Sequence, residues 1–327
     1  MNAALENPPR HDIIGDIHGR FDKLQNLLVH LGYEHDGVSH VPPAGHRTLF
    51  LGDLIDPKPG HAMPGGVRAT LQAVKAMVDG GHAQVILGNH ELNALCFHTL
   101  SPTGRPLRAH GSRNIRTHQG TLDDFPDHAD PASEWRTLWM PWLKSLPLFL
   151  DFGYLRAVHA CWHPRHLEFL TGKSLADDDF LLASSDKANP EGEAIEAVLK
   201  GLDLPLPPGY QYQDNTGIPR RRFRARWWEH PQPGTYCSEL VFPADDRIPP
   251  LPVATDALPE IPGYPDEAPP VFFGHYFKPT DETPGPERAN VACLDHGASV
   301  GGPLVAYRWQ GERELKVERF VSAKGAD

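Results

Sequence analysis

The stretch HDIIGDIHGRFDKL, residues 11–24, places an aspartate and a histidine two positions apart between glycines. The apolar run within 11–16 predicts a short buried strand that ends at Asp16. Residues 20–33 predict an amphipathic helix, because apolar side chains recur there at three- and four-residue spacing. Glycine allows a sharp turn between the two elements, so Asp16 and His18 become two metal-capable side chains on one tight loop.

Two further stretches repeat this pattern: LFLGDLIDPKPG, residues 49–60, and VILGNHELNAL, residues 85–95. Each predicts a strand that ends in Gly-Asp or Gly-Asn and leads towards a helix. This rhythm favours parallel strands joined by helical crossovers. Because the carboxyl ends of neighbouring parallel strands meet at one edge of a sheet, five side chains are expected to converge there: Asp16, His18, Asp53, Asn89 and His90.

This convergence predicts a site for two metal ions, with the carboxylate of Asp53 bridging them. Histidine, asparagine and carboxylate ligands suit Mn, Fe, Zn, Co or Ni better than Ca or Mg alone. Two ions about 3.5–4 Å apart can bind a phosphate and activate water. A single Gly-Asp pair is usually only a turn. Three in order, each after an apolar strand and before a helix, favour the metal site.

The motifs GDIHGR, GDLID and GNHE resemble those of the phosphoprotein phosphatase superfamily within the calcineurin-like metallophosphoesterases. AVHAC around His159 and FFGHY around His275 extend the resemblance, which covers about 10–160 and 270–320. It implies an α/β fold in which two mixed sheets pack face to face between helices, as a four-layer αββα sandwich. The whole chain, 1–327, would form one domain.

The segment 161–270 interrupts this resemblance. It shows little periodicity, and its end is rich in proline, which disfavours helix interiors and central strands. The segment is therefore predicted to be an insertion or cap over the core or the site. A partly disordered loop is the alternative.

The resemblance implies roles for the matching positions. The ligands of one ion would be Asp16, His18 and Asp53, and those of the other Asp53, Asn89, His159 and His275. His90 would donate a proton to the leaving group and be oriented by Asp56, while a hydroxide bridging the ions attacks phosphorus. An imidazole suits proton delivery at neutral pH. A purely structural His90 is the alternative.

One position departs from the family pattern. Pro57 stands where the family normally has arginine directly after the second aspartate of GDxxD, and proline cannot clamp a phosphate. Lys58 is one candidate replacement, as a point charge. The run RRRFRARWW, residues 220–228, with five arginines, is another. The alternative for this run is a solvated basic surface.

The stretches FRARWW, FFGHY and LDHGASVGGPLVAYRW resemble the C-terminal part of bacterial symmetrical bis(5′-nucleosyl)-tetraphosphatases. This resemblance implies that Arg224 and Arg226 contact substrate phosphates and that the loop after Asp295 closes the site. His296 stands where a threonine is usual. It is either a further phosphate contact or a capping residue.

Three functions follow as hypotheses. The leading one is a phosphomonoesterase of the serine/threonine phosphoprotein phosphatase type. The alternative is a symmetrical dinucleoside polyphosphate hydrolase, which an adenine-stacking surface at Trp162, Trp227 or Trp228 would favour. The third is a binding protein that has lost catalysis. The expected partner is thus a phosphorylated substrate, either a phosphoprotein or a nucleotide.

The composition argues against two other classes of protein, nucleic-acid-binding proteins and membrane proteins. The formal net charge of −11 argues against binding a nucleic-acid polymer, which needs a basic surface. The chain contains no run of 18 apolar residues and begins without a signal pattern. No membrane association is expected, and a cytoplasmic location is predicted.

Overall fold

The computed structural model describes residues 8–214 and 217–325, and its first sheet has five strands. They follow the order β15-β14-β1-β4-β5, with β1, β4 and β5 parallel and β14 antiparallel to both of its neighbours. The three parallel strands are the three that the sequence predicts. The strands of this sheet are β1 (Arg10–Ile14), β4 (His46–Phe50), β5 (Ala83–Val85), β14 (Leu304–Trp309) and β15 (Phe320–Ala323).

The second sheet has four strands in the order β13-β12-β7-β6. Its strand β12 runs parallel to β7 and β13, and β6 pairs antiparallel with β7. Both sheets are therefore mixed, as the resemblance implies. The strands are β6 (Phe149–Asp151), β7 (Arg156–Val158), β12 (Val271–Phe273) and β13 (Val291–Cys293).

The two sheets pack against each other through alternate residues. Ile13 and Leu49 of the first sheet belong to the same buried cluster as Ala157 and Phe272 of the second. Their neighbours along the strands, such as Ile14, belong to a different cluster that includes the helices. This period of two is what a strand with two buried faces requires. The predicted four-layer arrangement is confirmed.

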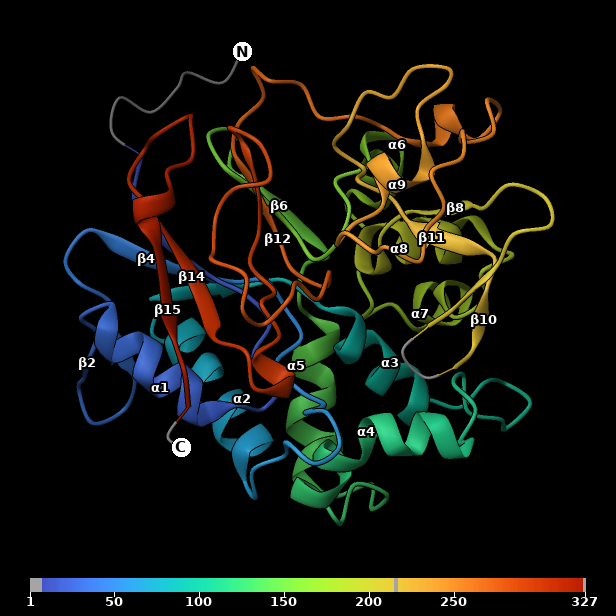
Figure 1. The fold of residues 1–327 in the computed structure, drawn as a ribbon. Coiled ribbons are helices and arrows are strands. Elements are labelled where there is room, and N and C mark those ends of the chain that lie inside the picture. The colour runs from blue at the N-terminus through green and yellow to red at the C-terminus, as the bar shows by residue number, and fades with distance from the viewer. Residues whose placement is uncertain (1–7, 215–216, 326–327) are drawn as a thin grey trace.

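The helices of the N-terminal half include α1 (Phe21–His30) and α2 (Gly66–Asp79), which pack on the first sheet. The others are α3 (Asn89–His98), α4 (Ser112–Asp124), the π-helical turn η1 (Trp135–Trp139) and α5 (Met140–Lys144). In Figure 1, α1 and α2 lie beside the five-stranded sheet, and α4 lies at the lower edge below α3. Leu24, Leu27 and Leu28 form the buried face of α1, as their spacing predicts.

The segment 161–270 is more regular than its sequence suggests. Its described residues form four α-helices, a 3-10 turn and several short strands, together with a small apolar cluster of their own around Phe223 and Leu240. It forms the yellow-green to orange region on one side of the molecule in Figure 1. Its elements are α6 (Pro164–Leu170), α7 (Asp178–Ser184), α8 (Pro190–Lys200), β8 (Asp203–Pro205), β9 (Tyr212–Gln213), β10 (Pro219–Arg220), β11 (Arg222–Arg224), α9 (Cys237–Leu240) and η2 (Leu258–Glu260).

The remaining elements are short. They are the hairpin β2 (Glu34–His35) and β3 (His40–Val41) and the 3-10 turns η3 (Ala298–Val300) and η4 (Val317–Arg319). In the part of the chain that the structure describes, no helix combines the length and the apolar character needed to span a bilayer.

Candidate active site

The predicted ligands lie just beyond the carboxyl ends of strands from both sheets. Asp16 and His18 follow β1, Asp53 follows β4, and Asn89 opens α3 after β5. From the second sheet, His159 follows β7 directly and His275 follows β12. The edges of the two facing sheets thus bring together side chains that are up to 259 positions apart in sequence.

Asp53 lies at the centre of this group. Its Oδ2 is 3.6 Å from Nε2 of His18, and its Oδ1 is 3.4 Å from Nε2 of His159. The backbone N–H of His90 also donates to Oδ1, at 2.9 Å. The two oxygens therefore face two different histidines, which is the arrangement that a bridging carboxylate requires.

The two histidines are held with Nε2 directed at the centre. Nδ1–H of His18 donates to the carbonyl of Ile55 at 3.0 Å, and Nδ1–H of His159 donates to the carbonyl of Leu51 at 2.7 Å. In each ring this contact fixes the orientation that directs Nε2 towards Asp53. Fixing a ligand histidine through its other nitrogen is the usual outer support of a metal site.

Asn89 links the two histidines that come from the second sheet. Its Oδ1 lies 3.0 Å from Nε2 of His159 and 2.6 Å from Nδ1 of His275. Within the described part of the chain, two sets of three side chains have ligand atoms within 4.8 Å of one another, and Asp53 belongs to both. The sets are His18, Asp53 and His90, and Asp53, His159 and His275.

The residues fit divalent cations on chemical grounds. Among the residues that the structure describes, Asp16 Oδ1 and His275 Nε2 are buried without a hydrogen-bond partner. Asp16 Oδ2 accepts the backbone N–H of His275 at 2.9 Å. Burial and the neighbouring carboxylate of Asp295 raise the pKa of Asp16 well above its usual range. A cation beside these atoms would satisfy them and offset the repulsion between the carboxylates.

Backbone strain is concentrated in the same place. In residues 8–214 and 217–325, the non-glycine residues with positive φ are His18 (51°), Asp53 (48°), Asp56 (62°) and His275 (64°). Left-handed backbone costs a residue with a Cβ about 1–2 kcal/mol. Such strain persists where the surrounding structure enforces it, and it commonly marks functional sites.

His90 and Asp56 form a buried pair next to this group. Nδ1–H of His90 donates to Oδ2 of Asp56 at 2.9 Å, and the two side chains are almost fully buried. Burial alone would lower the pKa of His90, but the carboxylates of Asp53 and Asp56 together raise it above its ordinary value. An imidazole that holds its proton near neutral pH is suited to act as an acid.

Sequence analysis missed Glu91. Its carboxylate accepts four backbone N–H groups, from Gly88, Asp53, Leu54 and Ile55, at 2.8–3.3 Å. It thereby holds the turn after β4 against the start of α3, and burial followed by the nearby Asp53 raises its pKa to about 7. A signal was present, because Glu stands three residues after Gly88, the spacing of a helix capping box.

Sequence analysis also missed two residues of α4. Nδ1–H of His118 donates to Oδ1 of Asp56 at 2.7 Å, and the hydroxyl of Thr121 donates to the same oxygen at 2.6 Å. Nothing in the sequence links α4 to Asp56, because the partners are more than 60 positions apart.

The predicted substrate contacts occupy different settings. Arg224 lies near the predicted ligand His275. Burial lowers the pKa of His275 well below its ordinary value, and the charge of Arg224 is the next largest cause. Lys58 is exposed, and its charge contributes, after burial and His90, to the lowered pKa of His18, about 4. Arg226 donates to the carbonyl of Val241 at 3.2 Å.

His296 is 1% exposed, and both of its ring nitrogens lack a partner among the described residues. Burial and the charge of Lys278 lower its pKa to about 4, so the ring is neutral near pH 7.

The tryptophans that would have supported nucleobase stacking are core residues. Trp227 and Trp228 are 0% and 1% exposed, and Trp162 is 6% exposed. All three belong to the main apolar cluster. None offers a free ring face to a base.

Two facing mixed sheets, with a His, Asp and Asn group at their carboxyl edge and a His–Asp pair beside it, define a metal-dependent phosphoesterase. The chain belongs to the calcineurin-like phosphoesterase family, whose sequence profile matches residues 10–182. The protein is therefore a phosphoester hydrolase, of a family built around divalent metal ions.

The chain is also similar to individual proteins of known type. The chain is 25% identical over 322 residues to a symmetrical bis(5′-nucleosyl)-tetraphosphatase of Vibrio campbellii, covering 92% of this chain and 96% of that protein. It is 31% identical over 157 residues to the asymmetrical bis(5′-nucleosyl)-tetraphosphatase PrpE of a Geobacillus species, covering 46% and 56%. The solved structure of a cold-active protein-tyrosine phosphatase from a psychrophilic Shewanella is 14% identical, with a TM-score of 0.48 over 94% of this chain and 80% of that one.

Proposed function

We propose that this protein hydrolyses dinucleoside polyphosphates symmetrically, so that a dinucleoside tetraphosphate yields two nucleoside diphosphates. The main support is similarity over nearly the whole chain, including the segment 161–270, to a protein named as a symmetrical tetraphosphatase. The similarity to the asymmetrical enzyme covers less than half of the chain. This proposal takes the place of the phosphoprotein phosphatase that sequence analysis put first.

Two divalent ions, with Mn the first choice, would be held by Asp16, His18, Asp53, Asn89, His159 and His275. When bound, they supply Lewis acidity and a nucleophile derived from water at neutral pH. Asp53 would be a ligand of both ions, because its two oxygens face His18 and His159.

The chain's own contribution to the chemistry is proton transfer. His90 would donate a proton to the oxygen of the departing nucleoside diphosphate, and Asp56 would fix the ring so that Nε2–H is the donor. The leaving oxygen would then be protonated as its bond to phosphorus breaks, so it would not depart as an anion. General-acid catalysis of this kind typically raises the rate about 10²–10⁴-fold.

Cations beside the centre would hold the remaining phosphates. Arg224 lies next to His275, and Lys58 reaches the side near His18. Arg226 and His296 complete the predicted contacts, although the first would have to leave the carbonyl of Val241 and the second its buried position. Since Arg224 belongs to 161–270, that segment would act as a cap that completes the site.

A nucleobase would need an aromatic surface other than the three tryptophans. Phe277 stands two residues after His275 and is 39% exposed, so it offers a ring next to a predicted ligand. The cytoplasmic location stays a prediction.

The test is a comparison of substrates with metal-stripped protein reconstituted with Mn²⁺. Diadenosine tetraphosphate, a phosphoserine peptide and 4-nitrophenyl phosphate are assayed side by side, and nucleotide products are separated by chromatography. ADP as the sole product, with the highest kcat/KM of the three substrates, is the expected result. Preference for the phosphopeptide, or equal amounts of AMP and ATP, would refute the proposal.

Two variants establish that the activity belongs to this site. Asp53→Asn is expected to abolish hydrolysis, and His90→Asn to lower kcat about 10²–10⁴-fold to a measurable residual rate, with the fold intact in both. Hydrolysis at the wild-type rate in both variants would come from a contaminant or another site.

A further inference from the structure

His118 makes a contact that the proposed mechanism does not explain. Asp56 carries an imidazole on each oxygen: His90 on Oδ2 at 2.9 Å and His118 on Oδ1 at 2.7 Å. Both histidines and the aspartate are buried. One histidine would suffice to hold a buried carboxylate, so the second needs a reason.

The contacts of Asp56 divide between the two oxygens. Oδ2 is used by His90, whereas Oδ1 accepts from His118 and from the hydroxyl of Thr121, at 2.6 Å. The oxygen of Thr121 in turn accepts the backbone N–H of Asp56 at 3.2 Å. Helix α4 therefore forms hydrogen bonds with both the carboxylate and the backbone of Asp56. The backbone of this residue is strained, with a φ of 62°.

The next hydrogen bond fixes the ring of His118. Its Nε2 lies 3.0 Å from Nε2 of His98. Nδ1–H of His118 donates to Asp56, so contacts hold the ring at both nitrogens. Burial, followed by the charges around it, lowers the pKa of His98 to about 2, so His98 is a neutral partner in this contact.

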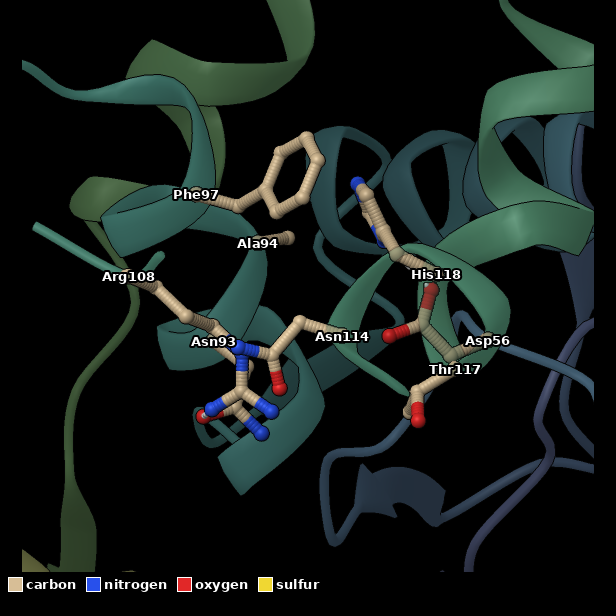
Figure 2. Close-up of a pocket in the computed structure, with 8 residues that line it drawn as sticks. All are labelled: Asp56, Asn93, Ala94, Phe97, Arg108, Asn114, Thr117 and His118. Atoms are coloured by element: carbon tan, nitrogen blue, oxygen red, sulfur yellow. Dashed lines mark hydrogen bonds and ion pairs between the residues drawn. The ribbon is translucent and has the colours of Figure 1, made fainter. Parts of the chain in front are cut away.

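Figure 2 shows the His118 and Asp56 side chains together at one side of a cavity of about 10 Å³. Arg108 and Asn93 line the same cavity, and Nη1–H of Arg108 donates to Oδ1 of Asn93 at 2.6 Å. A space of this size holds about one water molecule. The unit around Asp56 is thus closely packed, and its carboxylate has little freedom to rotate.

We propose that His118 is a positioning residue for catalysis: from α4 it holds the carboxylate of Asp56 in the one rotamer that directs the ring of His90 at the leaving group. The inference rests on the proposed function only in taking His90 as the proton donor. It predicts that His118 influences turnover through His90, rather than through folding or substrate binding.

A double-mutant cycle tests this dependence. In Mn²⁺-loaded enzyme, His118→Leu is expected to lower kcat about tenfold, the scale of losing an outer support, with KM changed less than twofold. In a His90→Asn background, the same substitution is expected to leave kcat unchanged. Equal losses in the two backgrounds would show a structural role and overturn the proposal.

Matched variants separate the hydrogen bond from packing. His118→Asn keeps an N–H donor near the position of Nδ1 and is expected to recover most of the lost kcat. Thr121→Val removes the other donor to Oδ1 without changing the shape of the side chain, and is expected to lower kcat in the same His90-dependent way. If Asn at 118 were as slow as Leu at equal stability, the proposal would be wrong.

A measurement without turnover covers the case in which the substrate proposal fails. If the protein does not hydrolyse diadenosine tetraphosphate, the cycle can be run with phenyl phosphate. Hydrolysis of phenyl phosphate but not of the dinucleotide would refute the proposed substrate and leave the role of His118 open to the same test. In Mg²⁺-loaded protein, the proton NMR signal of His90 Nδ1–H, assigned by its loss in His90→Asn, is expected to shift in His118→Leu and to stay in place in His118→Asn. An unshifted signal in His118→Leu would overturn the proposal whatever the activity.

Discussion

The ring of Pro57 lies directly against Gly120 of α4, at a separation that leaves no room for a side chain. A Cβ on Gly120 would come within 2.5 Å of Cγ and 2.9 Å of Cδ of Pro57. Pro57 stands where the family normally has an arginine. In this chain the position is used for helix packing, and the helix it meets carries His118 and Thr121 to Asp56.

Gly120→Ala tests whether this contact supports the site. Replacing glycine with alanine inside a helix usually adds about 1 kcal/mol of stability. Here the overpacking is expected to cost about 1–3 kcal/mol and to push α4 away from the turn that holds Asp56. The free energy of unfolding, from urea denaturation, and kcat are both expected to fall.

Gly111→Ala is the matched control at the start of the same helix, where an added Cβ meets none of the described atoms within 4 Å. Its kcat is expected to match that of wild type. Higher stability with unchanged kcat in Gly120→Ala would mean that α4 does not depend on close contact with Pro57.

Divalent metal is expected to stabilise the protein. The buried Asp16 carboxylate faces Asp295 and has an oxygen without a partner among the described residues. Mn²⁺ at about 100 times its Kd should therefore add about 2.7 kcal/mol per bound ion to the free energy of unfolding. Thermal unfolding of metal-stripped protein during Mn²⁺ addition measures this gain.

Asp53→Asn and Asp16→Asn distinguish the two metal positions. Because the carboxylate of Asp53 faces both histidine groups, its loss is expected to reduce the bound metal, measured by atomic absorption, at both positions. Asp16→Asn is expected to weaken one position only. Full occupancy in Asp53→Asn would contradict the bridging role.

Arg224→Gln is expected to weaken substrate binding rather than the chemical step. Removing a cation that pairs with a phosphate costs about 1.4 kcal/mol or more, which raises KM about tenfold. Steady-state kinetics with diadenosine tetraphosphate give the two constants. Arg222→Gln is the control, since that side chain lies on the same strand and donates to the carbonyl of Asp203. A KM that rises equally in the two variants would argue against a specific contact.

The stability of the protein is expected to depend on pH through His11, in β1. This side chain is 1% exposed and packs against Phe152, Tyr154 and Trp309. Burial and the charge of Arg47 lower its pKa to about 4, against about 6.5 in an unfolded chain. A lowered pKa favours the neutral ring, so the stability it contributes is complete above pH 6.5 and is lost as the pH falls towards 4.

His11→Phe should remove this dependence. Between pH 7 and pH 4.5, wild type is expected to lose about 2–3 kcal/mol more unfolding free energy than the variant. Urea denaturation at the two pH values measures the difference. His61→Phe, at an exposed position, should follow wild type. Parallel losses in wild type and His11→Phe would show that His11 is not protonated on unfolding.

Local sequence patterns were enough to predict most of the fold and most of the candidate metal ligands. A glycine turn follows each of the strands β1, β4 and β5. A few neighbouring residues therefore predict both the strand and the position of the ligand after it. Trp227 and Trp228 show the opposite case. Only the packing of 161–270 on the core decides that they are buried, and no short pattern contains that information. The same holds for His118, whose partner comes from a distant turn.

The strained backbone has a consequence for how this protein can evolve. His18, Asp53, Asp56 and His275 each adopt a conformation that glycine would accept without steric strain. In the metal-free protein, selection for thermal stability alone would therefore favour glycine at these positions, one at a time. A thermostable variant obtained without an activity screen should be inspected first at these four codons, because a trade-off between stability and turnover is built into them.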